Sequence, residues 1–394
     1  MKRIFITGFA LLGFLRATAQ DNVQTDSIAY KAQKLKLEEI NLVSSYYKQD
    51  GNNSAVTGGI GTEKLTDISN SIDVKFVKYG ETGKKHTWDF EVGVDQYSSA
   101  SSDMVDLSAN SSASYSDIRF YPSVSYSREN EEKGNTIGAG VSSSTEFDYQ
   151  SFGGNINYSK KTKDRNGEFT ARFQTYIDQV KLINPIELRP TIENGGTEGR
   201  NTFAGTLSYS QVVNQNLQVL FQADLVSQQG YLSLPFHRVY FNDGSVHQEN
   251  LPDSRFKIPL AVRASYFLGD NVIIRAYYRY YTDDWKLTSH TADIEVPVKL
   301  SPFFSLSPFY RYYSQSAVKY FSPYGQHTGS EQYYTSNYDL SKFDSSFFGM
   351  GVRIATPDGV FGIKHFSALE IRYGHYSRST NLTSDIISIN IKYK

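Results

Sequence analysis

Apolar and polar residues alternate along most of this chain with a period of two, and that alternation constrains the fold more than any other feature. Around Arg275, for example, Ile274 and Ala276 share one face while Arg275 lies on the other. Because successive side chains of a β-strand point to opposite faces, the pattern predicts strands with one apolar side. Sixteen strands are expected, over residues 38–48, 68–78, 86–97, 117–128, 136–147, 150–161, 168–180, 201–212, 216–228, 255–267, 271–283, 287–300, 303–315, 345–356, 366–378 and 385–394.

The connections between these strands differ systematically in length. Those after even-numbered strands are all short, whereas every long connection follows an odd-numbered strand. The long connections are 49–67, 98–116, 181–200, 229–254 and 316–344. A barrel with both termini on one side predicts this asymmetry, whereas a soluble Greek-key sandwich gives no reason for it. We therefore predict an all-β fold, a transmembrane up-and-down antiparallel β-barrel of about 16 strands with short periplasmic turns and long extracellular loops.

The composition is compatible with strands that cross a membrane. Only 39% of the residues are hydrophobic, but a barrel needs an apolar residue only at every second strand position. A charge facing lipid costs about 2–4 kcal/mol at the midplane, so charged residues must keep to one face, as they do in these strands. Many of the 30 Tyr and 25 Phe lie near strand ends, where amphipathic rings suit the lipid headgroups. We therefore expect outer-membrane lipid around the barrel.

Both ends of the chain carry signals for targeting. Lys2 and Arg3 precede an apolar run of about a dozen residues and a small-residue site ending at Ala19, the pattern of a cleaved secretory signal peptide. That run is too short to span a bilayer as a helix. The last strand is amphipathic and ends in Tyr393, which is typical of strands that barrel-insertion machinery recognises. The expected organisation is a signal peptide at 1–19, a periplasmic segment at 20–37 and an outer-membrane barrel at 38–394.

Charge and cysteine content exclude several classes of function. The formal net charge is −1, whereas a nucleic-acid partner would require a basic surface. The chain has no Cys, so it can form no disulfide, iron–sulfur cluster or thiolate metal site. We expect no cofactor and no metal.

Several unbroken strings resemble one bacterial family. They are Ser45 to Gly51, Ser54 to Glu63, Glu187 to Pro190, Gly230 to Phe236, Leu251 to Arg255, Asp283 to Trp285 and Tyr333 to Ser336. Together they resemble the outer-membrane barrel family catalogued as domain of unknown function thirty-five seventy, over nearly the whole mature chain. The resemblance implies the barrel fold and the outer-membrane location, and it assigns no activity. The family's association with flavin-transfer and thioredoxin-like proteins implies a link to extracytoplasmic redox work.

The connection 49–63 has an unusual concentration of glycine. Its distinctive residues are Asp50, Gly51, Gly58, Gly59, Gly61, Thr62 and Glu63. Glycine lets a backbone pass narrow places or expose its amides. No Lys-Ser or Lys-Thr follows the glycines, so a nucleotide-binding loop is not expected. One interpretation is a loop that folds into the lumen and narrows it, and the other is an outer loop that uses glycine for turns.

Charged residues of both signs fall on the face that would line the lumen. The candidates are Asp89, Glu91, Asp95, Arg172, Arg263, Arg275, Arg279, Asp293, Glu295, Arg311, Arg353, Glu370 and Arg372. The strands near Arg263 and Arg279 are biased towards basic residues, whereas the strand 86–97 is acidic. Opposite walls of a pore would then create a transverse field. Alternatively, the charges cancel as ion pairs and stiffen a plugged barrel.

A short hairpin at the predicted outer rim carries a second group of polar residues. Its first strand ends with Asp283, Asp284 and Trp285, and these face Ser289 and His290 in the next strand. A hydroxyl beside an imidazole is a pairing used in nucleophilic catalysis. However, adjacent strand residues point to opposite faces, so Ser289 cannot contact His290 in regular geometry. We expect a rim hydrogen-bond network and no catalytic residues.

These observations favour a pore, or the membrane component of a transport or export system. The alternative is a plugged barrel that anchors periplasmic or surface partner proteins through the segment 20–37.

Overall fold

The computed structural model describes residues 34–80, 83–98, 116–188 and 195–394. The expected signal peptide, most of the expected periplasmic segment and most of the connection 98–116 lie outside the described residues. Among the described residues, no helix is long and apolar enough to cross a membrane.

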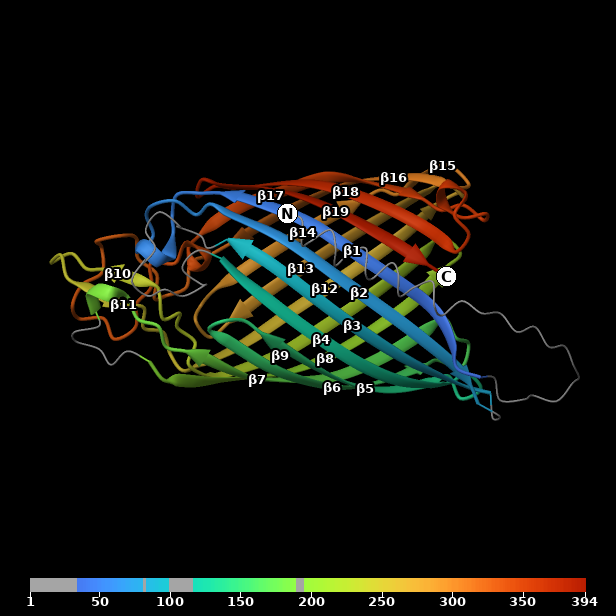
Figure 1. Ribbon diagram of the computed structural model, residues 1–394, viewed down its shortest axis with the longest axis horizontal. Coiled ribbons are helices and arrows are strands. Elements are labelled where there is room, and N and C mark those ends of the chain that lie inside the picture. The colour runs from blue at the N-terminus through green and yellow to red at the C-terminus, as the bar shows by residue number, and fades with distance from the viewer. Residues whose placement is uncertain (1–33, 81–82, 99–115, 189–194) are drawn as a thin grey trace, which may run out of the picture.

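The chain forms a closed antiparallel barrel in which strands that follow one another in the sequence lie side by side (Figure 1). Closure comes from β1, which pairs with β2 on one edge and with the last strand, β19, on the other. The barrel strands are β1 (Lys36–Asp50), β2 (Leu65–Tyr79), β3 (Lys84–Ser98), β4 (Ser116–Asn130), β5 (Asn135–Thr145), β6 (Tyr149–Lys161), β7 (Gly167–Lys181), β8 (Thr197–Asn214), β9 (Leu217–Gly230), β12 (Ser254–Leu268), β13 (Val272–Asp283), β14 (Thr288–Glu295), β15 (Val298–Ser301), β16 (Phe304–Gln315), β17 (Phe343–Ile354), β18 (Phe366–Arg378) and β19 (Leu382–Tyr393).

Two of these strands, β14 and β15, occupy a single position in the wall. Both pair with β13 on one side and with β16 on the other, and Pro297 lies between them. Proline has no N–H to donate to a neighbouring strand, which accounts for the break. The wall therefore has sixteen positions. The predicted fold class is confirmed, and each of the predicted strands is present.

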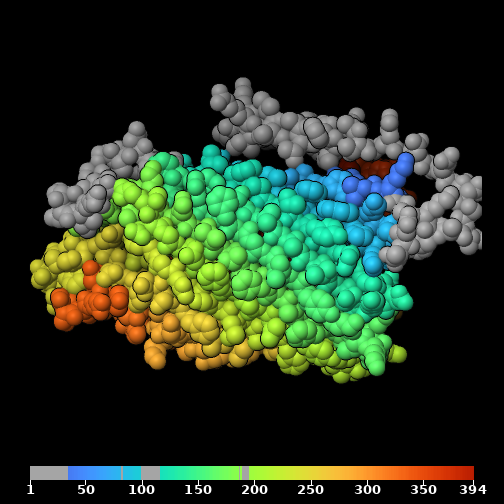
Figure 2. Space-filling model, turned by 90° about the horizontal axis from the view of Figure 1, so that it is seen from below, coloured from blue at the N-terminus to red at the C-terminus, as the bar shows by residue number. Residues whose placement is uncertain are grey.

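The two faces of the wall differ in polarity. The outward register exposes large apolar side chains, among them Val141 and Phe152 at 65% and Ile118 at 58%. Figure 2 shows the continuous outer wall over the middle strands. The buried apolar cluster lies outside the barrel wall, among the long loops, where Trp285 and Leu287 pack with Leu251 and Val318. Such an exposed apolar belt on a closed barrel is what a lipid-facing surface requires.

The two ends of the barrel are built differently. The C-terminus lies at the end with the short turns, and the long loops gather at the other end (Figure 1). Following the topology of outer-membrane barrels, we place the short turns in the periplasm and the loops outside the cell. The connections contain the hairpin strands β10 (Arg238–Tyr240) and β11 (Val246–Gln248) and the short 3-10 helices η1 (Ala55–Thr57), η4 (Ile186–Leu188), η5 (Tyr338–Leu340) and η6 (Val360–Gly362).

Candidate pore lumen and extracellular cap

The thirteen charged residues singled out from the sequence all lie in barrel strands, in the register opposite to the lipid-facing side chains. In β3, for instance, Phe90 and Val92 are 41% and 40% exposed on the outer surface, so Glu91 between them points inwards. The inner wall borders cavities of 590, 540 and 630 Å³. Arg275, Glu295 and Arg372 line both of the first two cavities.

Ion pairs neutralise part of the basic wall. Arg311 Nε lies 3.0 Å from Asp293, and Arg275 lies 3.4 Å from Glu295. Arg372 lies 2.9 Å from Glu295, although β16 and β17 separate the strands that carry these two residues. This ion pair therefore joins two strands that are not neighbours in the sheet, and it spans part of the concave inner surface.

Around β3, hydrogen bonds hold much of the acidic wall. Asp95 accepts hydrogen bonds from the hydroxyls of Ser69 and Tyr121 and lies 4.0 Å from Arg119. Asp89 lies 3.9 Å from Lys75. Six strands, β4 to β9, separate β3 from the arginine-bearing β12, so the acidic and basic walls lie on roughly opposite sides of the barrel.

The glycine-rich connection 51–64 folds back on itself at the outer rim. The amide of Glu63 donates to the carbonyl of Gly51 at 2.8 Å, and the Glu63 carboxylate accepts the amide of Asn53 at 3.1 Å. Asp50, at the base of this connection, is exposed and lies 4.0 Å from Lys64. Burial raises the pKa of Glu63, and the opposing effects of the Asn53 amide and of Arg378 do not cancel this.

Positive φ angles let this connection make close contacts with other loops. Gly58, Gly59 and Gly61 have φ of 78°, 89° and 85°, a region that side chains disfavour. A Cβ on Gly58 would meet the ring of Tyr240 in β10, and one on Gly59 would lie 2.7 Å from the Ser336 carbonyl oxygen. Thr62 follows in the same connection.

Arg238 joins loops that leave the barrel on opposite sides. It pairs with the carboxylate of Glu187 in the β7–β8 loop through two nitrogens, and its Nη1 donates to the Val56 carbonyl in the β1–β2 loop at 2.8 Å. Around the wall, six strand positions separate β2 from β9, and six separate β12 from β1. A contact between the β1–β2 and β9–β12 loops must therefore cross above the mouth. We call the assembly of the β1–β2, β7–β8, β9–β12 and β16–β17 loops the extracellular cap.

A buried carboxylate ties two of the cap loops together. Glu249 is 4% exposed and accepts hydrogen bonds from the Thr335 hydroxyl at 2.6 Å and the Leu234 amide at 2.9 Å. Burial acts to raise the pKa of Glu249, but the nearby His237 and these hydrogen bonds outweigh burial and lower it. His327, 1% exposed, meets the Glu331 carboxylate with one ring nitrogen and the Thr335 carbonyl with the other.

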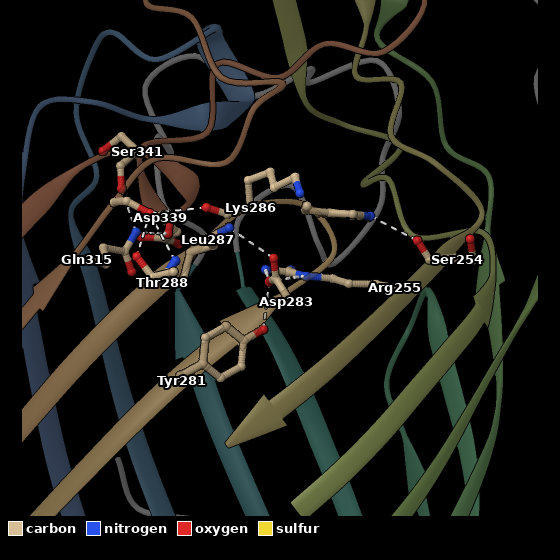
Figure 3. A network of polar contacts seen from close by, with 12 residues as sticks. Ser254, Arg255, Tyr281, Asp283, Lys286, Leu287, Thr288, Gln315, Asp339 and Ser341 are labelled. Atoms are coloured by element: carbon tan, nitrogen blue, oxygen red, sulfur yellow. Dashed lines mark hydrogen bonds and ion pairs between the residues drawn. The ribbon is translucent and has the colours of Figure 1, made fainter. Parts of the chain in front are cut away.

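Asp283 is the centre of the rim network (Figure 3). Its carboxylate accepts hydrogen bonds from Arg255 Nε at 2.9 Å, from the Tyr281 hydroxyl at 2.8 Å and from the Leu287 amide at 3.0 Å. Trp285 is buried, donates to the Ser254 carbonyl at 2.9 Å, and lies under the Arg255 guanidinium. The network pins the β13–β14 hairpin to β12.

Other residues expected in the rim network lie elsewhere. Ser289 is 2% exposed, whereas His290 is exposed on the opposite face, with Nδ1 2.7 Å from the Tyr278 hydroxyl. Asp284 is exposed as well. The expectation of one network containing all of these residues is therefore wrong for His290, because neighbouring residues in a strand face opposite sides. Figure 3 also shows Gln315, which donates to the Asp339 carbonyl at 3.0 Å and holds the base of the β16–β17 loop.

No motif in the sequence marks Arg238 or Glu249 as a cap residue, and Glu249 is only one charge within an aromatic loop. No motif marks Ser245 either, although its hydroxyl lies 3.0 Å from His247 Nε2. That hydroxyl donates to Asp243, so the exposed turn uses it as a structural cap and not as an activated nucleophile.

Three carboxylates at the outer rim, those of Asp117, Glu146 and Asp148, offer oxygens within 4.8 Å of one another. Asp117 accepts the amides of Ile118 and Phe147, and Glu146 accepts the Tyr97 hydroxyl. These contacts give the first two carboxylates structural roles in the wall.

A closed wall of sixteen positions, apolar outside and charged inside, defines a transmembrane β-barrel of the outer-membrane type. The family described as Protein of unknown function (DUF3570) matches residues 10–379. The chain belongs to that family, and the resemblance noted in its sequence is confirmed.

Comparison with solved structures finds several chains of low sequence identity. The siderophore receptor PirA from Acinetobacter baumannii is 10% identical, with a TM-score of 0.44, over 88% of this chain and 54% of the receptor. This chain thus spans about half the length of that receptor. A bacterial polysaccharide outer membrane secretin is 10% identical, with a TM-score of 0.44, over 93% of this chain and 100% of the secretin. OccK1 of Pseudomonas aeruginosa is 8% identical, with a TM-score of 0.40, over 90% of this chain and 97% of OccK1. No curated protein matches.

Proposed function

We propose that the protein is an outer-membrane pore, or the membrane component of a transport system, through which small solutes pass along the charged inner wall. The observation that carries this proposal is an inner wall of arginines and carboxylates that borders cavities of 590, 540 and 630 Å³. Burying a charge without a partner is costly, so a dry, packed interior would not retain one. In the described part of the chain, Arg263 has no carboxylate partner, which favours a water-filled lumen.

The extracellular cap restricts the mouth of this pore in the proposed function. The contact of Arg238 with Val56 joins loops from opposite sides, and the glycines of the β1–β2 loop allow close packing beneath Tyr240 and Ser336. The glycine-rich loop would then act at the mouth, as a constriction, instead of lining the middle of the barrel.

The same cap supports a second candidate, a closed barrel that serves as a membrane anchor for periplasmic or surface proteins. A cap held by buried contacts such as that of Glu249 with Thr335 would keep the mouth shut. The two candidates differ in one measurable property, since only the pore conducts ions.

Single-channel recording in planar bilayers tests the choice, with the purified full-length protein and an Arg238→Ala variant. This substitution removes both the Glu187 pair and the bond to Val56, which together contribute about 1–3 kcal/mol to cap closure. We expect the wild-type protein to conduct and Arg238→Ala to show a larger open fraction, by about tenfold.

Arg165→Ala is the matched control, because Arg165 also contacts a carboxylate and a carbonyl of one neighbour, Glu131, but in a periplasmic turn. This variant should conduct like the wild type. If neither the wild-type protein nor Arg238→Ala conducts at any applied voltage, the pore is wrong and the anchor is favoured.

A further inference from the structure

One side of the lumen carries more positive charge than its carboxylates can neutralise. The 590 Å³ cavity is lined by five arginines and two carboxylates. The arginines are Arg263, Arg275, Arg279, Arg311 and Arg372, and the carboxylates are Asp293 and Glu295. Strand register explains the clustering, since Arg263 is opposite Tyr277, which is opposite Asp293, which is opposite Arg311.

The ion pairs within this cavity involve only three of the five arginines. Asp293 pairs with Arg311, while Glu295 is shared by Arg275 and Arg372. Arg372 also reaches Glu370 at 3.2 Å. Among the residues that the structure describes, Arg263 and Arg279 have no carboxylate, and the buried Nε of Arg279 has no hydrogen-bond acceptor. A guanidinium N–H without an acceptor is costly, and an incoming anion would satisfy it.

The same cavity has an aromatic floor. Phe309 and Phe347 face the lumen with ring centroids 5.1 Å apart. The wall behind the two rings carries glycine. A Cβ on Gly349 would lie 2.7 Å from the Phe309 ring, and one on Gly374 would meet the Phe347 ring. Glycine at both positions thus lets the two rings lie against the wall, where they present apolar surface within a charged lumen.

The excess of arginines and the two aromatic rings each restrict which solutes can bind in this cavity. The unpaired guanidinium groups select an anion, and a carboxylate matches their geometry because it can accept two parallel hydrogen bonds. The rings of Phe309 and Phe347 favour a solute with an apolar body over a fully hydrated inorganic anion. A cation would find Asp293 and Glu295 already engaged by arginine.

We propose that this basic side of the lumen binds small organic carboxylates with an aromatic or other apolar body, and that these are solutes the protein conducts. Arg263 and Arg279 hold the carboxylate, and Phe309 with Phe347 contacts the apolar body. The binding site stands on geometry alone, whereas its role in conduction rests on the proposed pore function.

Isothermal titration of the folded, detergent-solubilised full-length protein tests the site with benzoate, benzyl alcohol, acetate and inorganic phosphate. Loss of a charge-assisted contact corresponds to about tenfold or more in affinity. We therefore expect benzoate to bind at least about tenfold more tightly than each of the other three solutes. Equal affinity for benzoate and benzyl alcohol, or for benzoate and phosphate, overturns the proposal.

Variants locate the site. The double variant Arg263→Gln with Arg279→Gln should weaken benzoate binding about tenfold or more. Arg200→Gln is the control, because Arg200 lines the separate 630 Å³ cavity, and it should bind benzoate like the wild type. If the double variant does not fold, the ligand comparison on the wild-type protein still decides. Equal losses in the double variant and in Arg200→Gln would show non-specific attraction and overturn the assignment.

Bilayer recording separates this inference from the proposed function. Interruption of the current by benzoate, but not by benzyl alcohol, supports binding along the conduction path. A conducting protein that does not bind benzoate overturns the site and leaves the pore standing. A protein that binds benzoate selectively but never conducts leaves the site standing and overturns the pore.

Discussion

At the scale of single residues, Glu249 shows how a buried charge can hold a loop assembly together. Its carboxylate is almost fully enclosed, and the cost of removing it from water is offset by Thr335, Leu234 and His237. Thr335 belongs to the β16–β17 loop and His237 to the β9–β12 loop, so the contacts join two parts of the cap. A neutral carboxyl or amide at this position keeps only one carbonyl oxygen, so the Thr335 hydroxyl or the Leu234 amide loses its acceptor.

The lowered pKa of Glu249 leads us to expect that acid destabilises the cap. Its pKa in the folded protein lies below the ordinary 4.5, so its stabilising effect is complete above about pH 4.5 and is lost as the pH falls further, towards the folded pKa. Glu249→Gln should weaken the cap by about 1–3 kcal/mol at neutral pH and remove that acid sensitivity. Hydrogen exchange of the amides in 231–253 measures both effects. Asp284→Asn, an exposed rim carboxylate, should exchange like the wild type, and equal protection in Glu249→Gln would contradict this role.

At the scale of elements, the packing between β17 and β18 depends on a close approach of backbone. A Cβ on Gly349 would press against the backbone carbonyl of Tyr373, which cannot move without shifting β18. Gly205, in the middle of β8, has open space around the same position. The two glycines therefore serve different purposes, although each sits in a strand where glycine is intrinsically unfavourable.

These two positions predict opposite effects of the same substitution. Gly349→Ala should lower the free energy of unfolding by about 1–3 kcal/mol, as overpacking does. Gly205→Ala should leave it unchanged or raise it by about 0.5–1 kcal/mol, because alanine restricts the unfolded chain. Urea unfolding in lipid vesicles gives both values. Equal effects of the two substitutions would mean that β18 can shift freely away from β17.

At the scale of the whole molecule, closure and the lipid belt are inseparable. Pairing of β1 with β19 removes the last free edges, as a bilayer interior without water requires. Once the wall is closed, every strand residue faces either lipid or lumen. Ile389 and Asn390 are neighbours in β19, yet Ile389 is 38% exposed on the outer surface and Asn390 lines the 540 Å³ cavity.

Substitutions at Ile389 and Asn390 test which face of the wall contacts lipid. Ile389→Lys should cost about 2–4 kcal/mol in vesicles, because it places a charge in lipid near the middle of the strand. Asn390→Lys places the same charge in the lumen, opposite Glu370, and should cost little. Urea unfolding monitored by tryptophan fluorescence measures each variant. Similar costs for both would contradict an outward-facing lipid belt.

Local sequence determined the strands and the face of the wall on which each side chain lies. Alternation at Ile274, Arg275 and Ala276 depends only on the geometry of an extended backbone, so it can be read without knowing the neighbouring strands. The same geometry already excluded a contact between Ser289 and His290. Even the break at Pro297 follows from a missing N–H, although alternation through 287–300 predicts one continuous strand.

The tertiary structure alone decided which charges pair, and where loops meet. Arg372 reaches Glu295 across two intervening strands, and Arg238 reaches Val56 across the mouth. Neither contact leaves a periodic signal, because each depends on strand register and on the closure of the whole wall. The sequence by itself therefore determined a barrel with a charged interior. Only the closed structure decided that the loops form a cap and that, within the described part of the chain, Arg263 and Arg279 are left without carboxylates. The physical reason is that strand pattern is a property of neighbouring residues, while ion pairing and loop packing depend on residues brought together by closure.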